Sequence, residues 1–387
     1  MILKNVKLIG SNDLVNIGIS EGKITNVLSI ALKNTTDSLR LSFDGVLAFP
    51  GLINSHDHLD FNLFPQLGDK TYNNYTEWGS YIHKKYKEEI AGILKIPTSL
   101  RARWGIYKNL LCGVTTVVNH GERLATENDL ISVFEQCHCL HSVQFEKNWR
   151  LKLNKYDKRK LPVVIHAGEG DDWPSYYEIH QLIRWNLLKR KLIGIHAVAM
   201  SERQAKKFEA LVWCPQSNIF LLNKTAKINL LKKHAAILFG TDSTLTSSWS
   251  IWEHLRLARE THEITDEELC NTVGTNASTV WQLPCGEIAP GKDADLVIAN
   301  LAGGESNFNT FFGVNPKDIL LVIHKGNIRL FDEKLLPQLK ILNLDNFSKF
   351  YIKGACKYVQ GDLPGLMEKI WEYNPSVDFP VSVERPP

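Results

Sequence analysis

The chain has 387 residues, a formal net charge of +3 and 44% hydrophobic residues. That is enough for one large globular domain and a smaller one, and the near-neutral charge gives no electrostatic reason to expect nucleic acid or a membrane as partner. No run of about eighteen apolar residues occurs, so no spanning helix is expected. The seven cysteines lack Cys-x-x-Cys spacing, which predicts free thiols in a reducing, cytoplasmic compartment.

Both ends of the chain predict strands of one small domain. Residues 1–48 contain short alternating apolar segments with a tight turn at Gly22, and residues 285–335 return to this pattern with a hairpin turn near Gly326. Neither flank has enough strands for a stable sheet of its own. We therefore expect the two flanks to pair and form a small β-sandwich domain.

Residues 49–284 show a different pattern, in which short apolar runs alternate with helical stretches. Continuous apolar runs are typical of strands buried on both faces of a parallel sheet. Capping-box patterns at Ser201–Gln204 and Thr265–Glu268 indicate where two of the helices begin. The repeated strand–helix units predict an α/β fold with a TIM, or (β/α)8, barrel. The clearest apolar runs are Val114–Val118, Val163–Ile165, Ile193–Ile195, Ala210–Trp213 and Ile237–Phe239.

Two further segments concern the regularity of the predicted barrel and the C-terminal end of the chain. The stretch from Val118 to Leu161 is short for two barrel strands, for which Ile131–Glu135 and His141–Phe145 are the candidates. The helix between them would be nearly absent, so we expect the barrel to be distorted near its third and fourth strands. Residues 336–387 are predicted as a C-terminal helical extension, with helices at Phe347–Tyr358 and Leu363–Tyr373.

Polar residues that suit a metal follow several of the predicted strands. His56 and His58 follow Phe49–Ile53, and single polar residues follow three later strands: His166, His196 and Asp242. A single histidine at a strand end is more often a structural residue. Several at successive strand ends favour a functional site, because these ends meet at one rim of a barrel. Imidazoles and a carboxylate there predict a site for zinc or ferrous iron, and His-x-His directs both rings to one side of a strand.

Residues around these positions predict the rest of a catalytic site. Glu169 lies three residues after His166, where it can stand beside a metal without binding it and shuttle a proton. Aromatic residues follow His58 and Glu169, and aromatic walls suit a flat heterocycle, although packing of the loops against the barrel is an equal alternative. Trp78 also fits an ordinary helix face. The predicted substrate contacts are Phe61, Phe64, Trp78, Trp173, Asn218 and Ser243.

Several motifs together resemble the amidohydrolase superfamily, in particular its mononuclear deaminase and chlorohydrolase branch, which includes cytosine, guanine and adenosine deaminases. The resemblance covers roughly residues 1–330 and implies a TIM barrel beside a small β domain made from both flanks. By this resemblance the metal ligands are His56, His58, His166 and Asp242. Glu169 matches the general acid, and His196 matches the histidine that orients the metal-bound hydroxide. The motifs are Pro50–His58, Gly113–Val118, His166–Glu169, Pro215–Asn218, Gly240–Asp242 and Ile288–Val297.

The sequence departs from the binuclear members of that superfamily. Lys147 lies near the fourth candidate strand, but its surroundings do not resemble those of the carboxylated lysine that bridges two metals. We therefore expect one divalent metal ion, zinc in the first place and ferrous iron as the alternative. Asp242 is expected both to bind the metal and to accept a proton from water.

These features predict a metal-dependent hydrolase that deaminates an amino-substituted heterocycle with a metal-bound hydroxide. Hydrolysis of a cyclic amide, such as an imidazolone, or of a carbon–halogen bond on the same scaffold is the alternative. A non-catalytic scaffold protein is disfavoured because every expected ligand is present. A small zinc nucleic-acid deaminase is also disfavoured, because no His-x-Glu with a downstream Pro-Cys-x-x-Cys occurs. The expected partner is a small heterocycle, and a homodimer is the usual assembly of such enzymes.

Overall fold

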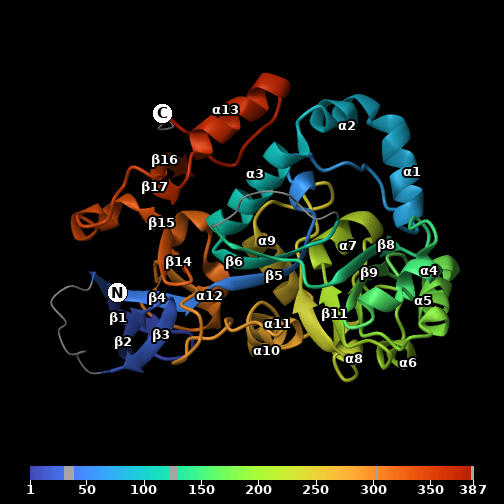
Figure 1. Cartoon of the computed structure of the whole chain (residues 1–387), viewed down its shortest axis with the longest axis horizontal. Coiled ribbons are helices and arrows are strands. Elements are labelled where there is room, and N and C mark those ends of the chain that lie inside the picture. Colours follow the sequence, from blue (N-terminus) through green and yellow to red (C-terminus); the bar gives the residue numbers. More distant parts are fainter. Residues whose placement is uncertain (30–38, 122–129, 302, 385–387) are drawn as a thin grey trace.

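The structure is a computed structural model that describes residues 1–29, 39–121, 130–301 and 303–384. Its described strands form one nine-stranded mixed sheet and two parallel sheets of five and three strands (Figure 1). Residues 30–38 of the predicted segment 1–48 and residues 122–129 of the predicted segment 49–284 lie outside the described residues.

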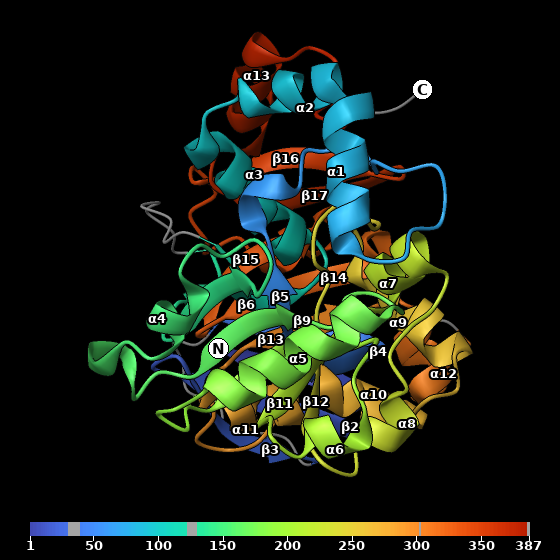
Figure 2. The same cartoon turned by 90° about the vertical axis from the view of Figure 1, so that its right-hand side faces the viewer.

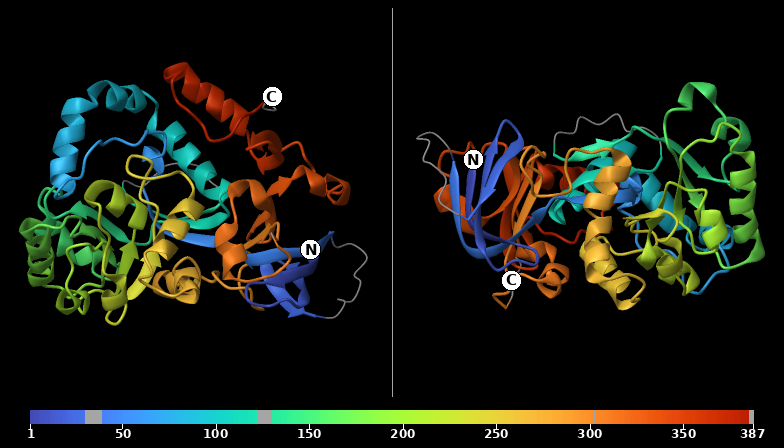
Figure 3. Two further views of the ribbon diagram at one scale, coloured as in Figure 1. Left: turned by 180° about the vertical axis from the view of Figure 1, so that it is seen from behind. Right: turned by 90° about the horizontal axis from the view of Figure 1, so that it is seen from below.

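The nine-stranded sheet contains strands from both ends of the chain. Its order is β16-β17-β15-β14-β13-β4-β1-β2-β3, and β4 from the N-terminal flank pairs antiparallel with β13 from the C-terminal flank. The right-hand view of Figure 3 shows the N-terminal strands beside the strands of the C-terminal flank. The strands are β1 (Ile2–Leu8), β2 (Leu14–Ser20), β3 (Lys23–Leu28), β4 (Arg40–Pro50), β13 (Leu296–Ala299), β14 (Ile319–His324), β15 (Asn327–Asp332), β16 (Phe347–Ile352) and β17 (Ala355–Gln360).

The two turns predicted in these flanks meet in space. Gly22 connects β2 to β3, and Gly326 connects β14 to β15, both in the left-handed region with φ of +75° and +76°. A side chain on Gly326 would come within 2.8 Å of the Cα atom of Gly22. Glycine is therefore required at Gly326 both for the backbone conformation and for the close approach.

Eight strands between the flanks are parallel to their neighbours. They form the sheets β5-β6-β7 and β8-β9-β10-β11-β12. The long strands β5 and β6 are buried at every position, which explains their continuous apolar and small residues. The strands are β5 (Leu52–Asp57), β6 (Val114–Asn119), β7 (Ser132–Phe134), β8 (His138–Ser142), β9 (Val163–Ala167), β10 (Leu192–His196), β11 (Ala210–Trp213) and β12 (Ala236–Phe239).

The two parallel sheets come together at one end. The backbone of Asp57 at the end of β5 forms a parallel bridge with Asp242 after β12, and the N–H group of His58 donates to the Asp242 carbonyl at 2.8 Å. Residues from all eight strands also share one hydrophobic cluster. No ladder joins β7 to β8 within the described residues. The carboxyl ends of β5, β9, β10 and β12 therefore lie near one another.

The compressed stretch before Leu161 contains both strands that the sequence predicts there. β7 falls inside the expected range Ile131–Glu135, whereas β8 begins three residues before the expected His141. Only residues 135–137 separate the two strands, so the helix between them is absent, as expected. Residues 122–129 of this stretch lie outside the described residues.

Helices connect and cover the parallel strands (Figure 2). Three of them, α1 to α3, lie between β5 and β6, and the capping boxes predicted at Ser201 and Thr265 begin α6 and α10. No helix in the described part of the chain is long and apolar enough to cross a bilayer. The helices are α1 (Tyr75–Lys85), α2 (Lys87–Leu94), α3 (Thr98–Leu111), α4 (Trp149–Leu153), α5 (Trp173–Trp185), α6 (Glu202–Ala205), α7 (Pro215–Leu222), α8 (Ile228–Leu231), α9 (Ile251–Glu260), α10 (Asp266–Thr272), α11 (Thr275–Trp281), α12 (Phe308–Gly313) and α13 (Leu363–Tyr373).

The prediction of a helix at Phe347–Tyr358 is wrong. This segment forms β16 and β17, which extend the nine-stranded sheet by pairing β17 with β15. Phe350 and Ile352 alternate with more exposed residues, and Lys353 and Gly354 adopt left-handed conformations that make the turn. A short apolar segment can fit the periodicity of a helix or that of a strand. Here pairing with β15 stabilises the strand. The second predicted helix is present as α13, which packs beside α3 (Figures 1 and 2).

Candidate metal centre

The structure brings His56, His58, His166 and Asp242 together, and we call these four residues the metal cluster. Their donor atoms all lie within 4.8 Å of one another. Nε2 of His56 is 3.4 Å and Nε2 of His58 is 3.6 Å from Oδ1 of Asp242. The arrangement follows from the fold, because β5 and β9 end beside the segment after β12.

The chemistry of the metal cluster fits a divalent cation. Three imidazoles and one carboxylate are a ligand set that zinc prefers. Neither ring nitrogen of the buried His56 has a hydrogen-bond partner among the described residues. Nδ1 of His166 donates to the carbonyl of His141 at 2.7 Å, which leaves Nε2 as the electron-pair donor. Burial and the nearby His56 lower the pKa of His58 to about 4, so its ring is in the neutral form that binds metal.

Asp242 is held in place by its own turn and by two hydroxyl groups. Its backbone is left-handed, with φ of +61°, directly after β12. Ser217 and Thr246 donate to Oδ2 at 2.8 and 2.9 Å, which leaves Oδ1 directed at the histidines. Burial opposes ionisation, but His56, His196 and His58 together bring the Asp242 pKa well below its ordinary value. The side chain is therefore a carboxylate with one oxygen available for a cation.

Glu169 and His196 lie beside the metal cluster. Oε2 of the buried Glu169 is 3.5 Å from Nε2 of His196, and the two residues form a second potential ligand group with Asp242. Nδ2 of Asn218 donates to Nδ1 of His196 at 2.8 Å, which leaves Nε2 to carry the ring proton toward Glu169. Burial, followed by the charges of Asp242 and Glu178, raises the Glu169 pKa well above its ordinary value. This shift favours the protonated form of the carboxyl group.

A cavity of about 510 Å³ opens onto these residues. Four of the six predicted substrate contacts, Phe61, Phe64, Trp78 and Ser243, are among its lining residues. The other two lie elsewhere. Trp173 is 69% exposed at the start of α5, and Asn218 is fully buried against His196.

A profile of the amidohydrolase family matches residues 142–329. The match confirms the resemblance predicted from the sequence and includes His166, Glu169, His196 and Asp242. His56 and His58 precede the matched span, and the fold brings them to it. No curated protein matches the chain in sequence.

Solved structures of similar fold include deaminases and a chlorohydrolase. A zinc-bound adenosine deaminase from Xanthomonas campestris superposes with a TM-score of 0.72 at 14% identity, over 97% of this chain and 98% of that one. A 5-methylcytosine deaminase from Klebsiella pneumoniae, liganded with 5-fluorocytosine, gives 0.64 at 18% identity, over 86% and 98%. A zinc-bound atrazine chlorohydrolase from Arthrobacter aurescens gives 0.64 at 17% identity, over 84% and 94%. The chain spans nearly the whole length of each.

Sequence reasoning missed His120, which lies next to the metal cluster. Its ring centroid is 4.5 Å from that of His166 and 5.0 Å from that of His56, and the residue is buried. His120 directly follows β6, so it carries the same strand-end signal that identified His166 and Asp242. The same signal therefore identifies His120 as a candidate site residue.

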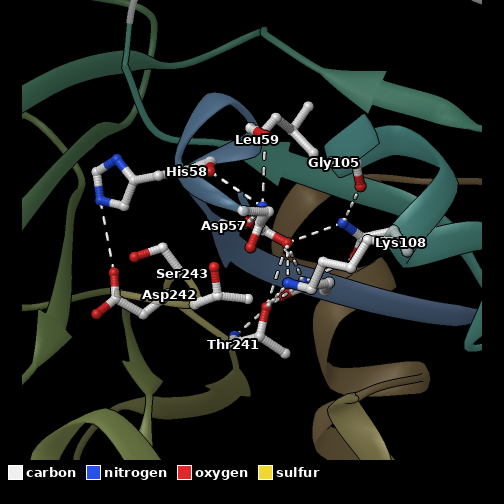
Figure 4. Close-up of polar contacts among 12 residues, drawn as sticks. Asp57, His58, Leu59, Gly105, Lys108, Thr241, Asp242 and Ser243 are labelled. Atoms are coloured by element: carbon white, nitrogen blue, oxygen red, sulfur yellow. Dashed lines mark hydrogen bonds and ion pairs between the residues drawn. The ribbon is translucent and has the colours of Figure 1, made fainter. Parts of the chain in front are cut away.

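A second missed group lies behind the metal cluster and contains Asp57, the middle residue of His-x-His. Figure 4 shows the ring of His58 directed at Asp242, whereas the Asp57 carboxylate is directed the other way toward Lys108 and Thr241. The Asp57–Lys108 ion pair, at 2.9 Å, is almost completely buried. Further donors to the Asp57 carboxylate are Asn54, Asn62, Asn109 and Thr241.

Glu178 on α5 supports the turn that carries Glu169. Its carboxylate accepts hydrogen bonds from the N–H group of Gly168 at 2.8 Å and from the hydroxyl of Tyr75 at 3.0 Å. Burial raises the Glu178 pKa to about 7, although both hydrogen bonds act in the opposite direction. The folded protein therefore binds a proton at Glu178 more tightly than the unfolded chain does.

This shift predicts a pH dependence of stability that Glu178→Gln removes. A raised carboxyl pKa contributes stability that is complete below the unfolded pKa and is lost as the pH rises through about 7. We expect urea unfolding of the wild type to show a loss of up to about 3 kcal/mol from this group between pH 4.5 and 8. The Glu178→Gln variant should lack this loss, and the exposed Glu372→Gln control should retain it. Equal pH slopes in wild type and Glu178→Gln would contradict the assignment.

Proposed function

We propose that this chain catalyses the metal-dependent hydrolytic deamination of an amino-substituted heterocycle. The observation that carries the proposal is the position of Glu169. A buried carboxyl group with a raised pKa shares one cavity with the metal cluster and His196. Hydrolysis at a ring carbon that bears an amino group requires such an acid next to an activated water molecule.

The roles of the side chains follow from their contacts. Glu169 protonates a ring nitrogen of the substrate, which makes the adjacent carbon electrophilic. Nε2 of His196, fixed by Asn218, donates to the attacking water and orients it. Asp242 accepts a proton from this water and passes it to the departing amine, while Ser217 and Thr246 hold its second oxygen. As the ring carbonyl forms, the hydroxyl proton of the adduct returns to Glu169, so that one water is consumed and one ammonia is released.

Three histidines and Asp242 would hold the metal, and we propose zinc as the ion, with ferrous iron as the alternative. When bound there, a divalent cation lowers the pKa of water so that it attacks at neutral pH. Support comes from the four converging donor atoms and from the unpartnered ring nitrogens of His56. The zinc-bound structures of similar fold are consistent with this choice.

Ammonia release from a panel of aminopyrimidines, aminopurines and pterins tests the proposal. We expect turnover with at least one class, loss of turnover after removal of metal by a chelator, and recovery with one equivalent of zinc. Halogenated rings and cyclic amides belong in the same panel, because the alternative is hydrolysis of those bonds. Chloride release or ring opening without any ammonia release would replace deamination by that alternative, and metal content below a tenth of an equivalent would contradict both.

We also infer that the two parallel sheets are parts of one distorted (β/α)8 barrel over residues 49–284. Support comes from the contacts between β5 and the segment after β12 and from the hydrophobic cluster shared by all eight strands. Residues 1–48 and 285–335 then form the accompanying small β-sandwich domain. Residues 336–387 pack against both parts, through β17 on β15 and through α13 beside α3.

A further inference from the structure

The wall of the cavity that α1 and α2 contribute is mainly apolar, and Ser80 and His83 of α1 also line it. Ile82 and Trp78 come from α1, and Ile90 and Leu94 come from α2. Phe64 and Leu245 also line the cavity. This surface is contiguous with the metal cluster, because Phe61 stacks on the ring of His58 with centroids 5.5 Å apart.

The polar atoms of the aromatic residues here are already engaged by the protein. Nε1 of Trp78 donates to the carbonyl of Leu67 at 2.6 Å, and the hydroxyl of Tyr75 donates to Glu178 at 3.0 Å. Among the described residues that line the cavity, none is a lysine or an arginine. Glu169, Asp242, His58, His166 and His196 belong to the reaction site, and the other imidazoles of the lining are those of His83 and His141.

A substrate must match this division between a polar centre and an apolar wall. On the face formed by Trp78, Ile82, Ile90 and Leu94, a phosphate or carboxylate substituent would be buried against apolar side chains, and sugar hydroxyls would lose hydrogen bonds to water. An aliphatic or aryl substituent would instead gain about fourfold in affinity for each buried methylene group. The volume of about 510 Å³ is typical of sites for drug-sized ligands and exceeds what a bare heterocyclic ring occupies.

We propose that the substrate is an uncharged amino-heterocycle with an aliphatic or aryl substituent, which packs on the wall formed by α1 and α2. The proposal rests on the deaminase function above and specifies the class of substrate. The amino-bearing ring carbon lies at the metal cluster, and the substituent lies against Trp78, Ile82, Ile90 and Leu94.

A matched series of compounds tests this assignment with the zinc-loaded full-length protein. The series keeps one aminated ring and varies one substituent through hydrogen, methyl, propyl and a carboxylated chain of the same length as propyl. We expect kcat/KM and equilibrium affinity to rise about fourfold per methylene group and to fall at least tenfold from propyl to carboxylate. Equal values across the series, or a preference for the carboxylate, would overturn the proposal.

A second test of the proposal changes Leu94, a residue of the wall formed by α1 and α2. Leu94 is 52% exposed, so Leu94→Lys should be tolerated by the fold while it places a cation at the cavity. We expect this variant to lower the ratio of propyl to carboxylate affinity at least tenfold. Leu187→Lys makes the same change at an exposed leucine outside the cavity and should leave the ratio unaltered. An unchanged ratio in Leu94→Lys would also overturn the proposal.

The two proposals can fail separately. If no compound in the series releases ammonia, deamination is wrong for this ring, but titration calorimetry with the same compounds still measures the preference of the wall. If ammonia is released without any preference for apolar substituents, deamination stands and the substrate class is wrong.

Discussion

Replacing Glu169 by Gln is expected to lower kcat by about a hundred- to ten-thousandfold while metal content stays at its wild-type value. Gln has nearly the same shape as a protonated Glu, but its amide cannot deliver a proton to a ring nitrogen. Burial, followed by the charges of Asp242 and Glu178, raises the pKa of Glu169, which favours its acid form. Steady-state ammonia release, together with metal analysis of the purified protein, measures both quantities.

Glu178→Gln is the matched control for this prediction. Glu178 is the other buried glutamate on the same side of the fold, and it binds Gly168 and Tyr75 without lining the cavity. We expect this variant to retain kcat within about tenfold of the wild type, since the loss of a general acid is typically worth more than that. Near-wild-type turnover in Glu169→Gln would remove Glu169 from the mechanism. An equal loss in both variants would show that the effect is structural.

The site residues at the ends of strands could be predicted from the sequence, because the neighbouring residues of the chain show where each strand ends. Each apolar run shows where a strand ends, and the parallel arrangement places those ends at one rim. That reasoning found His56, His166 and Asp242, which the structure brings within reach of one another. It missed His120, although this residue comes soon after the predicted strand Val114–Val118.

Other features depend on partners that the sequence does not reveal. The hairpin of β16 and β17 forms where a helix was expected, because β15 offers an edge to which Phe347–Gln360 can pair. Lys108 looks like an ordinary residue of α3, yet the fold buries its ammonium group against Asp57. For Trp173, the position after Glu169 predicted a contact with the substrate. In the structure this residue lies in the first turn of α5, where its side chain is exposed. Long-range contacts decide each of these outcomes.

Replacing Lys108 by Met should weaken metal binding and destabilise the metal-free protein together. Lys108 contacts both Asp57, between His56 and His58, and Thr241, the neighbour of Asp242, so it joins the two segments that carry these ligands. Removal of one partner of a buried ion pair typically costs about 3–5 kcal/mol. Disturbing groups that orient metal ligands typically costs about ten- to a hundredfold in affinity. Urea unfolding of the metal-free protein and zinc titration against a competing chelator measure the two effects.

Lys357→Met separates these effects, because it breaks a second buried ion pair far from the metal cluster. Lys357 on β17 binds Asp332 at 2.8 Å inside the nine-stranded sheet. We expect Lys357→Met to lose a similar 3–5 kcal/mol or so of stability and to bind zinc with wild-type affinity. The double variant Asp57→Asn with Lys108→Met should recover part of the stability, since no buried charge is left unpaired, but not the zinc affinity. If Lys108→Met binds zinc as tightly as Lys357→Met does, the Asp57–Lys108 pair serves the fold alone.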